Sequence, residues 1–472
     1  MERPIRKYTR LRQSNWIATE SASLDLPDIR CVNIPRHLAS ERRSIRRACI
    51  LWIAALIAGA QTGCSKSEPP AMNEPSAMNP ATAESAVATA ALVERGQYLA
   101  FAGNCGACHT AAGGPPFAGG LAFETPFGKV YSANITPDPD TGIGSWTSGQ
   151  FLRSLRQGLR ANDQHLYPVF PYPALTKITD EDAVALFAFL KSVPAVRYDV
   201  PKNEMSWPFG QRWLLRAWNA VFLDEGPYKP DTGKSAEWNR GAYLVTGPAH
   251  CSACHSPRNL LGAEGAAKAM TGGTYRDDSA GGVMRPWSAP NLTSASSGLG
   301  SWSVEEIAAY LKAGTNSYAT TFGPMNSVIL KSTTHLREAD LRAMAVYLKS
   351  LPPNEGDFGA PAKADVLQAG ETIYNVNCGT CHQPDGMGAD DAGPRLAGNP
   401  VTQASDPASL VNSILYGPDV PSPAPAGHQW RPMEAYGDKL SDEEVAALAS
   451  YLRSAWRNKG GEVTARQVAK QR

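Results

Sequence analysis

The chain has 472 residues, with 45 lysine and arginine residues against 44 aspartate and glutamate residues, so its formal net charge is +1. This balance lacks the strong basic excess that is typical of nucleic-acid-binding proteins, and we expect no nucleic-acid partner. The long apolar run, ACILWIAALIAGA at 48–60, has thirteen residues. A bilayer-spanning helix needs about 20, which excludes a polytopic membrane protein.

The N-terminal region has the composition of a targeting segment. Residues 1–63 carry 11 basic and 5 acidic residues, and four arginines come just before the apolar run. A basic stretch followed by a short apolar stretch is typical of a secretory signal, so we interpret 1–63 as a leader. Because the signal lies unusually deep in the chain, we favour a true start codon downstream of Met1 over a long basic region.

Cys64 directly follows the leader and precedes a segment rich in alanine, proline and serine. We expect 64–90 to be a flexible tether, since this composition cannot form a packed core. The pattern resembles a lipoprotein signal, in which Cys64 becomes the lipidated first residue. Gln61 disagrees with it, because such signals prefer an aliphatic residue there. The alternatives are ordinary cleavage near Ala60 and an uncleaved anchor with an unmodified Cys64.

One motif occurs three times, as CGACH at 105–109, CSACH at 251–255 and CGTCH at 378–382. A segment with glycine and an aromatic residue precedes each copy, and an amphipathic helix follows each, with start signals at Thr179 and Ser441. No segment shows sustained strand-like alternation, so we predict an all-α chain. Its modules are expected at 91–225 (module one), 226–360 (module two) and 361–460 (module three), followed by a tail at 461–472.

The residue after the second cysteine decides how these motifs are interpreted. Cys-x-x-Cys alone also fits a disulfide, a zinc ligand pair, a redox pair or an iron–sulfur ligand. A histidine directly after it is the attachment signature of c-type haem, in which two thiols bond the porphyrin and the histidine binds iron. Zinc would need further ligands, and outside the leader only four other histidines remain, at 165, 250, 335 and 428.

We therefore predict three covalently bound haem c groups. The attachment residues are Cys105, Cys108, Cys251, Cys254, Cys378 and Cys381, and the proximal iron ligands are His109, His255 and His382.

A methionine on a loop across the haem is the usual sixth ligand. Met325 in FGPMNSV and Met433 in RPMEAYG follow prolines at matching positions, and we predict both as ligands rather than as core gap-fillers. Module one has no methionine in the aligned window 167–169, although His165 and Phe170 are near it. Haem one is then bound by His165, or is five-coordinate, or takes a ligand from a distant position.

The segments RGQYLAFAGNCGACHT, LYPVFPYP, NRGAYLVTGPAHCSACHSPRN and LREADLRAMAVYLKSLP carry a family resemblance that runs from Val93 to Trp456. The chain resembles the triheme cytochrome c subunits of periplasmic membrane-bound dehydrogenases of proteobacteria. This resemblance implies three tandem class I cytochrome c domains and the iron ligands His109, His255, His382, Met325 and Met433. Alcohol-dehydrogenase-type members tend to have methionine at the place of Phe170, so this departure favours another dehydrogenase partner.

The resemblance also implies what the protein does. It would relay electrons from a quinoprotein, flavin or molybdenum dehydrogenase subunit to ubiquinone or a terminal oxidase, in the periplasm and attached to the inner membrane surface. We expect no substrate chemistry of its own. One alternative is a haem enzyme with an open iron site at haem one, acting on peroxide or a small sulfur compound. Another is a periplasmic electron store without a dedicated dehydrogenase.

Overall fold

The computed structural model describes residues 90–278, 282–420 and 430–472, all within the compact unit Met78–Arg472. The leader, Cys64 and the tether up to residue 89 lie outside the described residues. Within the described ranges, no helix combines the length and the apolar character that a bilayer crossing requires.

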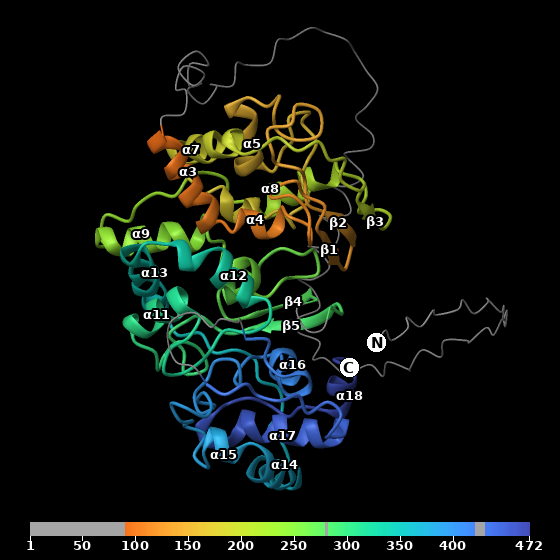
Figure 1. Ribbon diagram of the computed structural model, residues 1–472, viewed down its shortest axis with the longest axis vertical. Coiled ribbons are helices and arrows are strands. Elements are labelled where there is room, and N and C mark those ends of the chain that lie inside the picture. Colours follow the sequence, from red (N-terminus) through yellow and green to blue (C-terminus); the bar gives the residue numbers. More distant parts are fainter. Residues whose placement is uncertain (1–89, 279–281, 421–429) are drawn as a thin grey trace, which may run out of the picture. The chain divides into compact units, whose positions relative to one another are not determined.

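Each of the three modules is built on a pair of packed helices (Figure 1). The pairs are α3 (Ala90–Ala102) with α7 (Asp180–Ser192), α9 (Ala236–Thr246) with α13 (Glu338–Ser350), and α14 (Ala364–Asn377) with α17 (Asp442–Ser454). The first helix of each pair meets its partner at a glycine: Gly96, Gly241 or Gly370. A methyl group there would lie 1.9, 1.9 or 2.2 Å from a backbone oxygen of the partner helix. The glycine before each CxxCH motif therefore permits the helix crossing.

Shorter helices complete the modules. Module one adds α4 (Cys105–Cys108), α5 (Ser148–Gln157), α6 (Tyr172–Leu175) and α8 (Leu214–Phe222). Module two adds α10 (Ser252–His255), η2 (Ala266–Lys268), α11 (Val304–Ala313), α12 (Met325–Lys331) and η3 (Thr333–His335). Module three adds α15 (Gly379–His382), α16 (Ala408–Tyr416) and η4 (Ala455–Arg457), and α18 (Ala465–Ala469) follows it. The predicted helix starts are confirmed: the side chains of Thr179 and Ser441 accept hydrogen bonds from the backbone N–H groups of Asp182 and Glu444.

Two small antiparallel sheets depart from the all-α expectation. One has the order β1 (Ala122–Thr125), β2 (Gly128–Tyr131), β3 (Glu204–Met205), and the other pairs β4 (Gly273–Asp277) with β5 (Arg285–Ala289). Each strand has only two to five residues, which is too short for an alternating pattern to stand out in the sequence. The expected tail also contains a packed helix, since α18 contacts α17 and its Val468 is buried.

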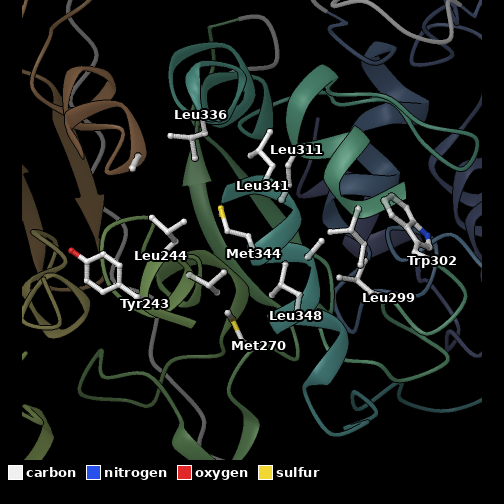
Figure 2. Packing of buried hydrophobic residues seen from close by; sticks show 14 residues of the cluster. Tyr243, Leu244, Met270, Leu299, Trp302, Leu311, Leu336, Leu341, Met344 and Leu348 are labelled. Carbon is white, nitrogen blue, oxygen red and sulfur yellow. The ribbon is translucent and has the colours of Figure 1, made fainter. Parts of the chain in front are cut away.

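Each module has its own hydrophobic core between its helices. Figure 2 shows this for module two, where the side chains of Leu244, Met344 and Leu348 gather between α9 and α13. Met344 and Leu348 also line a large cavity. The core packing thus forms one wall of the cavity that the CxxCH motifs border.

Candidate haem sites

Each CxxCH motif forms one helical turn directly after the first helix of its module. These turns are α4, α10 and α15, after α3, α9 and α14. The two cysteines of each motif lie one turn apart, and none of the six described cysteines forms a disulfide. Burial raises the pKa of the Cys105, Cys251 and Cys378 thiols to about 12.

The histidine of each motif is held in the same way. The Nδ1 atoms of His109, His255 and His382 donate hydrogen bonds to backbone carbonyls, with Nδ1–O distances of 2.7, 2.8 and 2.8 Å. The acceptors are the carbonyls of Ala133, Pro290 and Pro394. Because a carbonyl only accepts, the proton must be on Nδ1, which leaves the Nε2 lone pair free for a metal. Burial lowers the pKa of all three imidazoles and so favours this neutral, ligating form.

A cavity of about 1630 Å³ is lined by most of the predicted attachment and ligand residues, although not by Cys105, His109 or Cys381. Its walls include the following members of the predicted set: Cys108, Cys251, Cys254, His255, Met325, Cys378, His382 and Met433. Protein interiors are close-packed, and ordinary ligand pockets measure roughly 300–1,000 Å³. A cavity of this size, walled mainly by apolar side chains and bordered by thiols and imidazoles, fits large apolar groups such as haem.

Both predicted methionine ligands line this cavity. Met325 is the first residue of α12, follows Pro324, and packs against the core of module two. Met433 packs against the core of module three. Met325 and Met433 thus line the same cavity as His255 and His382.

Module one differs from the other two. His165 does not line the cavity; its carbonyl oxygen accepts a hydrogen bond from Arg212, and its Nδ1 has no partner within the described chain. Phe170 packs against the core of module one. Met205 does line the cavity, because β3 pairs with β2 and brings Met205 opposite Gly128. In the sequence, Met205 lies well past the expected ligand loop, beyond Pro194, and for that reason it is not among the predicted ligands.

Modules one and two meet through a reciprocal pair of contacts that sequence reasoning also missed. The hydroxyl of Tyr98 in module one donates to Asp340 in module two, and the hydroxyl of Tyr243 in module two donates to Asp182 in module one. Each carboxylate is also paired with an arginine of its own module, Arg240 or Arg95. The signal was present in the repeated Arg-Gly-x-Tyr pattern before two of the CxxCH motifs.

The two CxxCH motifs of these modules are neighbours as a result. His250, directly before Cys251, donates from Nε2 to the carbonyl of Gly103 at 3.2 Å, and Gly103 lies two residues before Cys105. Burial, with a smaller effect of nearby Cys108, raises the pKa of Cys254 to about 11. The attachment segments of modules one and two are therefore in contact.

The chain is similar in sequence to known cytochromes c. Residues 93–194 and 367–456 match the cytochrome c family. The chain is 39% identical over 411 residues to the cytochrome c subunit of quinone-dependent alcohol dehydrogenase from Gluconacetobacter polyoxogenes, covering 83% of this chain and 86% of that one. It is 38% identical over 400 residues to the gluconate 2-dehydrogenase cytochrome c subunit of Pantoea cypripedii, covering 80% of this chain and 89% of that one.

A third relative is much longer than this chain. It is a component of the nicotinate dehydrogenase of Pseudomonas putida and is 43% identical over 373 residues, which are 77% of this chain but only 30% of that protein. The cytochrome c match and the nearly full-length dehydrogenase relatives imply covalently bound haem c and a role in electron transfer. The chain belongs to the family of cytochrome c subunits of alcohol, gluconate and fructose dehydrogenases.

Proposed function

We propose that this chain carries three haem c groups and relays electrons from a periplasmic dehydrogenase subunit to ubiquinone or a terminal oxidase. The observation that carries the proposal is the threefold repeat of one geometry: a CxxCH turn whose histidine Nδ1 donates to a backbone carbonyl. A bound haem c supplies one-electron redox chemistry. The three modules would then be tandem class I cytochrome c domains at 91–225, 226–360 and 361–460.

The chain's own residues would hold the three groups as follows. The six cysteines of the motifs form the covalent attachments, and His109, His255 and His382 supply the proximal nitrogen. Met325 and Met433 would supply the sixth ligands of the second and third haem groups. Their positions on the cavity wall support this assignment. Carbonyl acceptors at Nδ1 fix each ring's orientation and increase its basicity as a ligand.

The sixth position in module one separates electron relay from enzyme chemistry. His165 does not line the cavity, which weakens the proposal of a bis-histidine site. We propose that this position has no methionine from the expected loop, because Phe170 stands there. A relay requires no open position, whereas the alternative haem enzyme requires one. A high-spin signal from one haem in three, in the oxidised spectrum of the purified chain, would favour the enzyme.

The catalytic partner is proposed to be a quinoprotein, flavin or molybdenum subunit. Relatives named for alcohol, gluconate, fructose and nicotinate dehydrogenases support a dehydrogenase as the catalytic partner. The test is to purify the intact complex through a tag on this chain and to use mass spectrometry to identify the accompanying catalytic chain. Addition of the substrate of that dehydrogenase should reduce the haem bands. A chain that purifies without a dehydrogenase, and that no co-purifying activity reduces, would refute the relay.

The proposed location is the periplasmic face of the inner membrane. The leader at 1–63 supports export, which covalent attachment to CxxCH requires in bacteria. Lipidation of Cys64, followed by the tether, would hold the haem-bearing body at the bilayer. A single acyl chain binds membranes only marginally, so stable attachment needs a second contact.

A further inference from the structure

One edge of strand β5 in module two contacts helix α16 of module three (Figure 1). In the described part of the chain β5 pairs with one strand, β4, so the backbone groups on its other edge need partners from elsewhere. One face of α16 supplies them. Ser409 and Asn412, three positions apart in the helix, contact Ser288 and Pro286, which are two positions apart in the strand.

Three hydrogen bonds join Ser288 to Ser409. The hydroxyl of Ser409 accepts from the backbone N–H of Ser288 at 2.9 Å and donates to the carbonyl of Ser288 at 2.8 Å. The backbone N–H of Ser409 lies in the first turn of α16, where the helix offers no acceptor, and it donates to the hydroxyl of Ser288 at 3.1 Å. Each serine therefore satisfies backbone groups of the other module.

The contact is buried. Ser288 and Ser409 are 6% and 4% exposed, so water does not readily replace a lost partner, and an unpaired backbone group there is costly. The side-chain N–H of Asn412 adds a bond to the carbonyl of Pro286 at 2.9 Å, and proline has no N–H that would need a partner. The backbone groups of both strand positions are thus paired with α16.

On the side of module two, the contact lies close to the segment that holds a proximal histidine. Pro290 directly follows β5, and its carbonyl accepts the hydrogen bond from Nδ1 of His255. Ser288 is only two residues before Pro290. A shift of β5 would therefore move the acceptor that orients the His255 ring.

On the side of module three, the same helix supports the loop of a predicted sixth ligand. Leu410 and Ile414 of α16 belong to the core against which Met433 packs. The carbonyl of Ile414 also accepts from the backbone N–H of Tyr436, three residues after Met433, at 2.9 Å. A shift of α16 would therefore move the Met433 loop.

We propose that Ser288 and Ser409 are positioning residues for electron exchange between the second and third haem groups. Their contact fixes the strand that leads to the His255 acceptor against the helix that supports Met433. Electron exchange between two redox groups slows steeply as their separation grows, so a contact that fixes both ligand-bearing segments also sets the rate. The inference rests on the electron-relay function proposed above and adds the residues that connect two of its carriers.

Hydrogen–deuterium exchange of the full, haem-loaded chain tests the contact itself. Ser409→Ala removes the partner of both backbone groups of Ser288. The amides of 285–289 and 408–412 should then exchange about 5- to 150-fold faster, which corresponds to the loss of a buried hydrogen bond, while those of α9 should not change. Ser413→Ala is the matched control, because Ser413 lies one turn later on the same cavity wall but donates to the carbonyl of Ser409 within α16, at 2.9 Å.

Pulse radiolysis measures the electron exchange, because it adds electrons to the haem groups without a dehydrogenase. The redistribution phase that involves module three is identified by its change in Met433→Ala. This phase should slow several-fold in Ser409→Ala and keep the parental rate in Ser413→Ala. Ser288→Ala, which removes only the bond from the Ser409 N–H, should also slow it, and it replaces Ser409→Ala if that variant does not load its haem groups.

Faster amide exchange with an unchanged redistribution rate would overturn the proposal, because the contact would then be structural only. Unchanged amide exchange in Ser409→Ala, or equal slowing in Ser413→Ala, would overturn it as well. Reduction of the parent chain by the dehydrogenase is measured separately and reports the electron-relay proposal. Failure of that reduction, with the redistribution rates as expected, would refute the relay and leave the role of the two serines intact.

Discussion

Gly370→Ala should destabilise module three by closing the approach between α14 and α17. The added methyl carbon would lie 2.2 Å from the carbonyl oxygen of Ala447 and 2.7 Å from the Cβ of Tyr451. Ordinary contacts between carbon atoms are about 3.5–4.0 Å, so the helices must separate by more than about 1 Å. Such overpacking lowers the free energy of unfolding by about 1–3 kcal/mol or more, and the higher helix propensity of alanine offsets up to about 1 kcal/mol of this loss. We expect a net loss of about 2 kcal/mol.

Gly149→Ala is the matched control, because Gly149 also lies in a helix, α5, but its nearest neighbour to the new methyl is 3.9 Å away. This variant should be neutral or more stable by up to about 1 kcal/mol. The assay is native-state hydrogen exchange of peptides from α14 and α17, which reads the opening free energy of module three by itself. If Gly370→Ala leaves this exchange unchanged, or if both variants change it equally, the close helix crossing does not depend on the glycine.

Four further predictions follow from the same structure. Mass spectrometry of the mature protein should show three haem additions of roughly 0.6 kDa each, and two or fewer would refute the threefold attachment. Met325→Ala and Met433→Ala should each remove about half of the thioether–iron band and lower the potential of one haem, since methionine ligation raises it; a loss in Met205→Leu would instead reveal a third methionine ligand. Burial acts to raise the pKa of the Glu355 carboxyl, but hydrogen bonds from Ser297 and Ser296 and the charge of Lys459 outweigh it and lower this pKa to about 2. The stabilisation is therefore present above the unfolded pKa of about 4.5 and is lost as pH falls toward about 2, so Glu355→Gln should flatten acid unfolding in that window, by about 1 kcal/mol after solvent screening. Labelled fatty acid should enter the parent chain and not Cys64→Ser, and label retained in that variant would remove the lipoprotein proposal.

Short sequence motifs were enough to predict several features of this protein. A CxxCH motif carries its meaning within five residues, so attachment cysteines and proximal histidines could be predicted without a fold. Helix starts at Thr179 and Ser441 could also be predicted, because a cap and its N–H partner are three residues apart. The glycine and aromatic residues before each motif were visible as a repeat, although their role in helix crossing was not.

Features that depend on residues distant in sequence were decided by tertiary structure alone. Tyr98 and Asp340 are 242 positions apart, and no local sequence pattern predicts a hydrogen bond between side chains of two modules. The pairing of short strands brings Met205 to the cavity wall, whereas His165 does not line the cavity.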